Sequence, residues 1–221
     1  MQRQPGITIE RRHTRARPSL ATAARLWGAL AGLGGLVHGI GEVVQGNATT
    51  PGLFIPSWTI GPIADNLGGE PGLTVIPNFL VTGILTIALA SLLIAVSARR
   101  AAAGPSGWAL LALSTGMLLV GGGVGPPVIG LCAGVAALAS RRARARQRKT
   151  GRPTEHRTLW PWLFWLALAD TLFLVFGSLF AAFVLDVDVS NAFVVAFLAA
   201  VVLLPITIVA GNRAARKEPA T

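Results

Sequence analysis

The sequence GGGVGPP at residues 121–127 interrupts an apolar stretch that extends from residue 108 to residue 139. As one continuous helix this stretch would be about 48 Å long, well beyond the roughly 30 Å of a bilayer's hydrocarbon core. Clustered glycines and a Pro-Pro pair break helices. The stretch therefore predicts a tight hairpin of two short helices, which either crosses the membrane twice or only re-enters it.

The distribution of basic residues supports the hairpin. All nineteen Lys and Arg residues fall in four blocks, at residues 3–25, 99–100, 141–157 and 213–217. Such clusters flank membrane helices on the cytoplasmic side. A single crossing by 108–139 would place the third block opposite the other three, whereas a hairpin keeps all four on one side. We therefore expect an even number of crossings and both termini in the cytoplasm.

The composition is that of a membrane protein. Only 13% of the 221 residues are charged and the mean hydropathy is +0.62, whereas about a quarter of the residues in soluble domains are charged. The net charge of +10 indicates that the basic residues attract anionic lipid headgroups, which contributes about 1 kcal/mol per side chain. We do not interpret this charge as a sign of nucleic-acid binding. One cysteine, Cys132, excludes an internal disulfide and a multi-thiolate metal site.

Four further apolar segments are long enough to cross a bilayer. They lie at residues 26–44, 76–98, 159–185 and 191–210. With the central hairpin they predict an all-α polytopic membrane helix bundle of six segments in three hairpins. The predicted divisions are a basic cytoplasmic tail at 1–24, the bundle at 25–211, a cytoplasmic basic loop at 140–158 and a second tail at 212–221.

The connection at residues 45–75 is the longest outer loop. A structureless connection of this length is uncommon in a compact protein, and the aliphatic and aromatic content of this one predicts a folded lid over the outer end of the bundle. Two interpretations of Trp58 remain open: it lines a ligand mouth, or it anchors the loop at the membrane interface.

Small residues recur along the first apolar segment. They are Gly28, Gly32, Gly35 and Gly39. Glycines at three- and four-residue spacing share a helix face and let a neighbouring backbone approach closely. We therefore expect the first helix to lie inside the bundle.

Polar residues also share one face of that segment. His38 precedes Glu42 by one helical turn, and Gln45 continues the column outward. We expect this column to meet three polar residues of the outer loop, namely Asn47, Asp65 and Asn66. Asp170 of the fifth segment lies at a similar depth, so it pairs with His38 if the two helices touch.

Three interpretations of the column compete. Placing an ionisable side chain inside a bilayer costs at least a few kcal/mol, so each such side chain is a candidate for a functional role. A proton or cation relay is one interpretation, because histidine titrates near neutrality. A metal site is the second, although one histidine and one or two carboxylates form a thin ligand set and no metal ligand is assigned. The third is a structural role in which His38 bonds Asp170 or Glu42 to lock the helices.

Two asparagines open returning segments in similar contexts, IPNFLVTGIL at 76–85 and VSNAFVVAFL at 189–198. We interpret Asn78 and Asn191 as helix N-caps. Asn78 is also a candidate ligand-binding residue.

The residues GEVVQGN at 41–47, followed by IPNFLVTGIL, resemble those of multi-pass membrane proteins predicted from bacterial genomes. The resemblance covers the first hairpin and extends to the turn at 121–127, and it implies no activity. Seventeen Arg against two Lys also indicates a bacterial genome rich in G and C.

These features predict an integral protein of the bacterial inner membrane that binds or conducts a small solute, ion or lipid headgroup through a buried polar site under the outer loop. The alternative is a non-catalytic accessory subunit whose glycine-rich first helix docks another membrane protein. A third possibility is a membrane enzyme acting on a lipid-soluble substrate, because paired acids perform acid–base catalysis. No catalytic residue and no cofactor is assigned, since phosphate-binding, HExxH, CxxC and GxSxG motifs are missing from the sequence.

Overall fold

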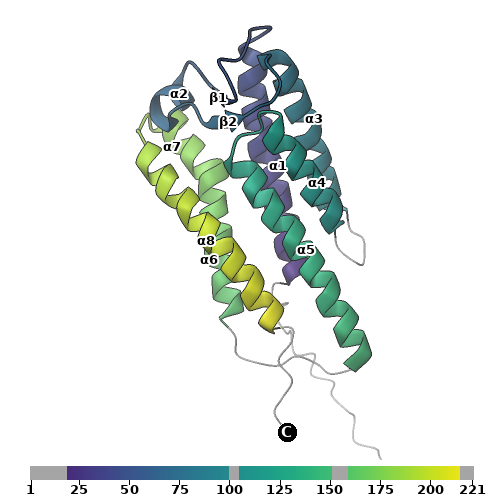
Figure 1. Ribbon diagram of the computed structural model, residues 1–221. Coiled ribbons are helices and arrows are strands. Elements are labelled where there is room, and N and C mark those ends of the chain that lie inside the picture. The colour runs from purple at the N-terminus through teal and green to yellow at the C-terminus, as the bar shows by residue number, and fades with distance from the viewer. Residues whose placement is uncertain (1–18, 100–104, 151–158, 215–221) are drawn as a thin grey trace, which may run out of the picture.

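The computed structural model describes residues 19–99, 105–150 and 159–214, which form a bundle of long helices with a small folded segment across one end (Figure 1). The long helices are α1 (Leu20–Val44), α3 (Phe79–Ala98), α4 (Gly107–Leu119), α5 (Gly125–Thr150) and α8 (Ser190–Ala214). A further continuous run consists of α6 (Trp160–Leu172), the π-helical turn η1 (Phe173–Gly177) and α7 (Ser178–Val184).

Within the described residues, four helical runs are long and apolar enough to cross a membrane: α1, α3, α6 through α7, and α8. The protein is therefore the helical membrane bundle that its composition predicts. Helix α4 has 13 residues and is about 20 Å long, which is shorter than a typical hydrocarbon core.

The helix breaks where GGGVGPP predicts a break. α4 ends at Leu119 and α5 begins at Gly125. Gly121 and Gly123 have φ values of 107° and 76°, in the region that side chains with a Cβ rarely adopt. The prolines that follow lie in the first turn of α5, where their missing N–H groups have no helical acceptor to lose.

Three predicted divisions need correction at their ends. Helix α1 begins at Leu20 rather than residue 26, because the Ser19 side chain accepts a hydrogen bond from Thr22 N at 3.2 Å and caps the helix. Residues 20–24 thus belong to the bundle, and the rest of the predicted tail lies outside the described residues. The predicted loop at 140–158 is helical as far as Thr150, and the last helix continues to Ala214.

Helix α1 is the central helix of the bundle, packed between α3 and α5. Its glycines lie at these contacts. A Cβ placed on Gly32 would be 2.8 Å from the Ala90 carbonyl oxygen of α3, and one on Gly39 would be 3.0 Å from the Gly83 carbonyl oxygen. Gly28 and Gly35 face other close neighbours, including Ser97 of α3 and Met117 of α4.

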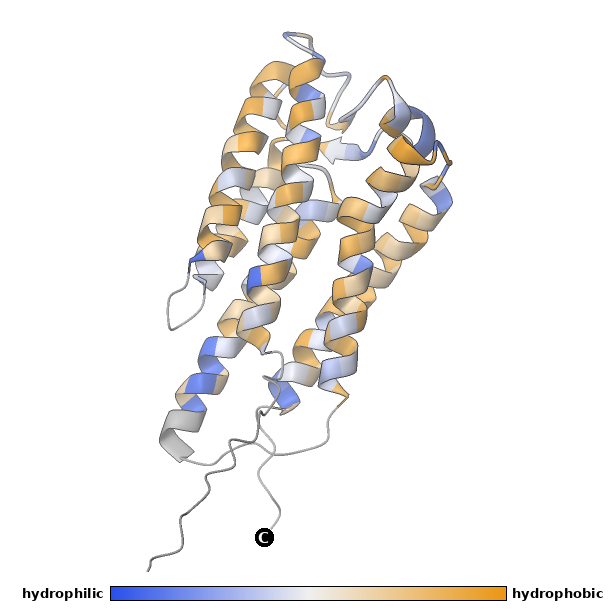
Figure 2. Cartoon of the chain, turned by 180° about the vertical axis from the view of Figure 1, so that it is seen from behind, coloured by the Kyte–Doolittle hydropathy of each residue, from blue (hydrophilic) through white to orange (hydrophobic). Residues whose placement is uncertain are grey.

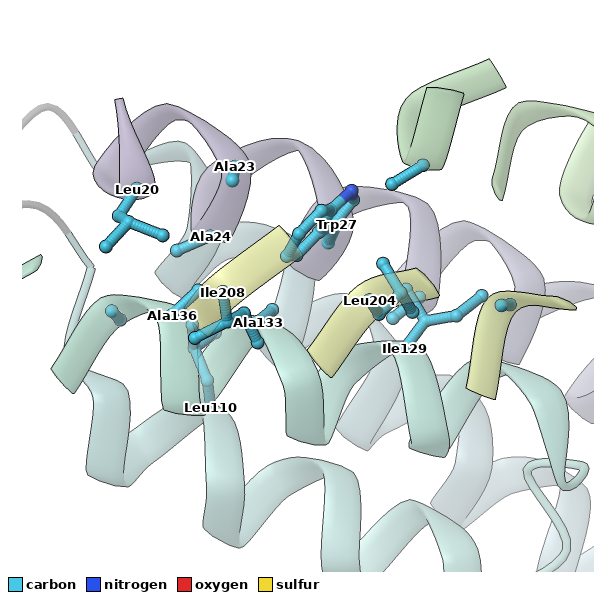
Figure 3. Packing of buried hydrophobic residues seen from close by; sticks show 14 of the residues in the cluster. Leu20, Ala23, Ala24, Trp27, Leu110, Ile129, Ala133, Ala136, Leu204 and Ile208 are labelled. Carbon is cyan, nitrogen blue, oxygen red and sulfur yellow. The ribbon is translucent and has the colours of Figure 1, made fainter. Parts of the chain in front are cut away.

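The apolar core at the inner half of the bundle joins helices far apart in sequence (Figure 3). Trp27 of α1 is fully buried and belongs to the same cluster as Ile129 of α5 and Leu204 of α8. The last helical hairpin is thereby attached to the central helix.

The connection between α1 and α3 is folded across the outer end of the bundle (Figure 1) and is called the lid below. It contains β1 (Phe54–Pro56), α2 (Pro62–Leu67) and β2 (Pro71–Leu73). The two strands pair antiparallel, with Ile55 opposite Gly72. The lid contacts both other turns at this end, since Val75 N donates to Leu119 O and Val189 N donates to Asn66 O, each at 3.0 Å.

The described basic side chains lie at the end opposite the lid, where α1, α4 and α6 begin and α3, α5 and α8 finish. They include Arg25, Arg99, Arg141 and Arg213. Figure 2 shows this separation, with hydrophilic residues at the lower ends of the helices and a mostly apolar middle.

Candidate functional site

A polar cluster forms where the outer half of α1 meets the lid. His38 of α1 is 4% exposed, and both of its ring nitrogens face lid residues. Nδ1 lies 2.9 Å from Ser57 Oγ, and Nε2 lies 3.3 Å from Glu70 Oε2. The lid therefore supplies two of the groups that surround this buried histidine.

Ser57 also joins His38 to Glu42. The Ser57 hydroxyl donates to Glu42 Oε1 at 3.4 Å, and Glu42 is fully buried. If Ser57 donates its one hydroxyl hydrogen to Glu42, His38 Nδ1 donates to Ser57. In that tautomer, His38 Nε2 and Glu70 Oε2 attract each other only when the pair carries one further proton.

Gln45 holds the lid in place for this contact. Its Nε2 donates to the backbone oxygens of Pro56 at 3.2 Å and Ser57 at 2.9 Å. All three residues of the predicted column, His38, Glu42 and Gln45, thus contact the lid at residues 56–57.

The broken turn between α4 and α5 closes the other side of the cluster. A Cβ on Gly121 would overlap the Glu42 carboxylate, and one on Gly123 would overlap the His38 ring. The glycines that break the helix therefore also let the backbone come close to both ionisable side chains.

Glu70 occupies an unusual backbone conformation. Its φ is 49°, a value that few residues other than glycine adopt and that costs on the order of 1–3 kcal/mol. Its backbone oxygen accepts a hydrogen bond from Ser57 N at 3.2 Å, and the residue is 5% exposed. Glu70 Oε2 has no aligned hydrogen bond from any described group, although His38 Nε2 is near. The strained backbone at Glu70 thus positions a carboxylate oxygen that can accept a further hydrogen bond.

Two adjoining cavities reach this pair. The larger, of about 300 Å³, lies between the lid, the start of α5 and α8. The smaller, of about 20 Å³, lies deeper among α1, α5 and the η1 region and is large enough for one water molecule. His38 and Glu70 line both cavities, whereas Glu42 and Asp170 line neither.

Several predicted site residues lie elsewhere in the lid. Asn78 caps α3, accepting from Val81 N at 3.0 Å, and its Nδ2 donates to Asn47 Oδ1 at 2.6 Å. Asn66 Nδ2 donates to Ala182 O and Asp186 Oδ1, which ties the lid to the turn before α8. These asparagines serve contacts within the fold, outside the cluster around His38.

The two remaining lid residues are also separate from the cavities at His38. Asp65 is exposed in the first turn of α2. Trp58 packs against Gly41 and lines a different hollow, of about 250 Å³, together with Gln45 and Phe79.

Two sequence interpretations require correction. His38 does not pair with Asp170, because Ser57 and Glu70 occupy both ring nitrogens; Asp170 Oδ2 is buried without a hydrogen-bond partner among the described residues. Asn191 is not an N-cap, because α8 already begins at Ser190.

Ser57, Glu70, Gly121 and Gly123 are the site residues that sequence reasoning missed. Ser57 and Glu70 come from a loop whose pairing is long-range, so no local period predicts that they meet His38. One signal was present for Glu70, which follows two glycines and precedes a proline in GGEPG at 68–72. Such a run indicates a tight turn that fixes the direction of its only charged side chain.

The cluster offers hydrogen bonding and proton exchange. Among the residues that the structure describes, no group of three or more His, Cys, Asp or Glu side chains is placed to hold a metal ion. Comparison of the chain with protein-family models, with curated proteins and with solved structures found no match.

Proposed function

We propose that the chain is an integral protein of the bacterial inner membrane with six apolar segments in three hairpins and both termini in the cytoplasm. The supporting observation is that three chain reversals, the lid and the turns after α4 and α7, lie at one end of the bundle, while the described basic side chains lie at the other. The cytoplasmic preference of basic residues then assigns the lid to the outer face.

The proposed activity is binding or conduction of a small solute, ion or lipid headgroup through the site under the lid. The observation that carries it is that His38 and Glu70, both almost fully buried, line a cavity of about 300 Å³. A purely structural ion pair would be packed on all sides, because buried polar groups without partners are costly. Here a carboxylate oxygen remains free beside an open volume.

The cavity favours binding over the accessory role. That alternative requires a free glycine face on α1, but the four glycines already pack against α3 and α4 within the chain. One observation favours a docking role. Asp170 Oδ2 is buried and has no hydrogen-bond partner among the described groups, and a basic side chain of a neighbouring membrane protein would supply that partner.

Proton flux into liposomes containing the purified protein tests conduction. We expect Glu42→Gln and Glu70→Gln to lower the flux by about tenfold or more, because neither amide exchanges a proton in the physiological range. Asp65→Asn, an exposed acid in α2 that lines neither cavity at His38, serves as the matched control and should leave the flux unchanged. Equal flux through all of these variants would remove conduction and leave binding as the only activity of the site.

A further inference from the structure

The shape of the larger cavity restricts what it binds. Its volume of about 300 Å³ is at the lower end of the usual range for ligand pockets, about 300–1,000 Å³. Apart from His38, Glu70 and Ser190, its lining side chains are apolar. These apolar residues come from the lid, the start of α5 and α8, and they are Leu67, Pro71, Val124, Phe193, Val194 and Phe197. A ligand that fits this cavity has an apolar body and one small polar end.

The polar end must donate hydrogen bonds. Glu70 Oε2 has no aligned hydrogen bond, and a carboxylate oxygen is an acceptor. The other hydroxyl of the lining, Ser190 Oγ, already donates to Asn66 O at 3.2 Å. His38 Nδ1 is occupied by Ser57. Glu70 Oε2 lies 3.3 Å from His38 Nε2 but forms no aligned hydrogen bond with any described group, so it can accept one from a ligand in the cavity.

The charge of the site excludes an anionic head. Two carboxylates, Glu42 and Glu70, lie on either side of His38, and Ser57 bridges two of the three groups. Among the described residues, neither carboxylate forms a salt bridge with Lys or Arg, whose described side chains lie at the opposite end of the bundle. A phosphate or carboxylate in this cavity, which Glu70 lines and Glu42 does not, would lie beside the Glu70 side chain with no Lys or Arg partner among the described residues.

The cavity adjoins the face of α8 that lines the outside of the bundle. Val194, which lines the cavity, is 54% exposed, and Val195 and Leu198 beside it are also exposed. The absent side chain of Gly125 leaves room for about one methyl group between α5 and α8, since a Cβ there would be 3.8 Å from the nearest atom of Phe197. In a membrane this face of α8 is covered by lipid tails, so an apolar molecule reaches the cavity from the bilayer.

We propose that the cavity binds a lipid-soluble amphiphile whose head donates hydrogen bonds and carries no negative charge, such as a long-chain amine or alcohol. The head binds Glu70, and the apolar body lies along Phe193, Val194 and Phe197 of α8. This assignment rests on the proposed binding function and narrows it to one class of ligand.

Photolabelling of the wild-type protein in phosphatidylcholine liposomes tests the proposal. Three diazirine probes share one octyl chain and differ only in the head, which is an amine, an alcohol or a carboxylate. We expect the amine and alcohol probes to label residues 124–125 and 193–197, and the carboxylate probe to label them about tenfold less, since a charge-assisted hydrogen bond is lost and like charge is added. This comparison needs no variant and so does not depend on how a variant folds.

The variant Glu70→Gln then tests the role of the carboxylate. Labelling by the amine probe should fall about tenfold, whereas labelling by the alcohol should persist, because the amide oxygen still accepts a hydrogen bond. Asp65→Asn, at an exposed acid that lines neither cavity, is the matched acid-to-amide control and should label like the wild type.

Two outcomes overturn the inference in different ways. If the carboxylate probe labels the cavity as strongly as the amine, the choice of ligand class is wrong while the proposed binding site stands. If none of the three probes labels these residues, the proposed ligand class is wrong. The proposed function is then tested separately, by the flux measurement and by identifying molecules that remain bound during purification.

Discussion

Ser57 is the residue on which the cluster depends most, because one hydroxyl contacts both His38 and Glu42. Replacing it with alanine removes one hydrogen-bond partner from each of two buried polar groups. We expect Ser57→Ala to lower the free energy of unfolding by about 1–3 kcal/mol. Denaturant titration of the purified protein in detergent, followed by circular dichroism, measures this change.

Ser114→Ala is the matched control for that variant. The Ser114 hydroxyl is equally buried but has no hydrogen-bond partner, so its removal should be neutral or stabilising. If Ser57→Ala proved as stable as Ser114→Ala, the bridging role of Ser57 would be wrong.

At this scale the sequence predicts only the part of the site that lies on one helix. Helical spacing alone places three of the side chains on one face of α1, namely those of His38, Glu42 and Gln45. Ser57 and Glu70 reach that face through pairing of β1 with β2 and through left-handed turns, neither of which has a local signal strong enough to place a side chain. The sequence left open whether His38 bonds Asp170 or Glu42, and in the structure its ring nitrogens meet Ser57 and Glu70 of the lid.

At the scale of the elements, glycines let the backbones of α1 and α3 approach each other closely where the two helices cross. A Cβ on Gly83 would lie 2.7 Å from both Gly39 O and Val43 N. We expect Gly83→Ala to lower the free energy of unfolding by about 1–3 kcal/mol, because two backbones must separate. Gly116→Ala, whose new methyl would meet only the end of the Leu89 side chain, should change stability far less in the same titration, and an equal loss in both variants would contradict this explanation.

The start of α8 carries a pH-dependent contribution to stability. A hydrogen bond from the backbone N–H of Ser190, at 2.9 Å, holds the pKa of the exposed Asp188 below its ordinary value of 3.8. The folded protein thus favours the charged form, so the contribution is present above pH 3.8 and is lost as the pH falls through the lower folded value. We expect Asp188→Asn to melt below the wild type near neutral pH.

The same comparison at acid pH checks the sign. As the pH falls below 3.8 and through the lower folded value, the wild-type carboxyl becomes neutral, and the difference in melting temperature between wild type and Asp188→Asn should shrink. A difference that is the same at both pH values would show that charge at Asp188 does not contribute.

Helix ends differ from the predicted bounds where a capping side chain extends the helix. The predicted first span begins at residue 26, but Ser19 caps the helix earlier and Leu20 is buried in the core. Asn78 was recognisable as a cap because a proline precedes it and an apolar run follows. Asn191 has a similar context, yet α8 starts one residue earlier, beside the Asp188 side chain that accepts from Ser190 N.

The orientation of the whole molecule follows from the separation of the lid from the basic residues. In a Cys132→Ser background, we expect a single cysteine at exposed Thr59 in the lid to react with a membrane-impermeant maleimide in intact cells. A cysteine at exposed Arg142 should react only after the membrane is opened. Labelling of Arg142→Cys from outside would place the third basic block on the outer face and contradict the hairpin of α4 and α5.

The central claim is that the cavity beside His38 and Glu70 holds a molecule. Native mass spectrometry of the protein, released gently from its own membrane, tests this claim. The measurement compares the wild type with two variants that carry substitutions at neighbouring positions of α8. Val194 lines the cavity and Val195 is exposed beside it without lining it, so Val194→Trp fills the cavity while Val195→Trp adds the same bulk toward lipid. The account predicts one bound molecule of constant mass on the wild type and on Val195→Trp, and none on Val194→Trp; a wild type without a bound molecule, or equal binding by both variants, would contradict it.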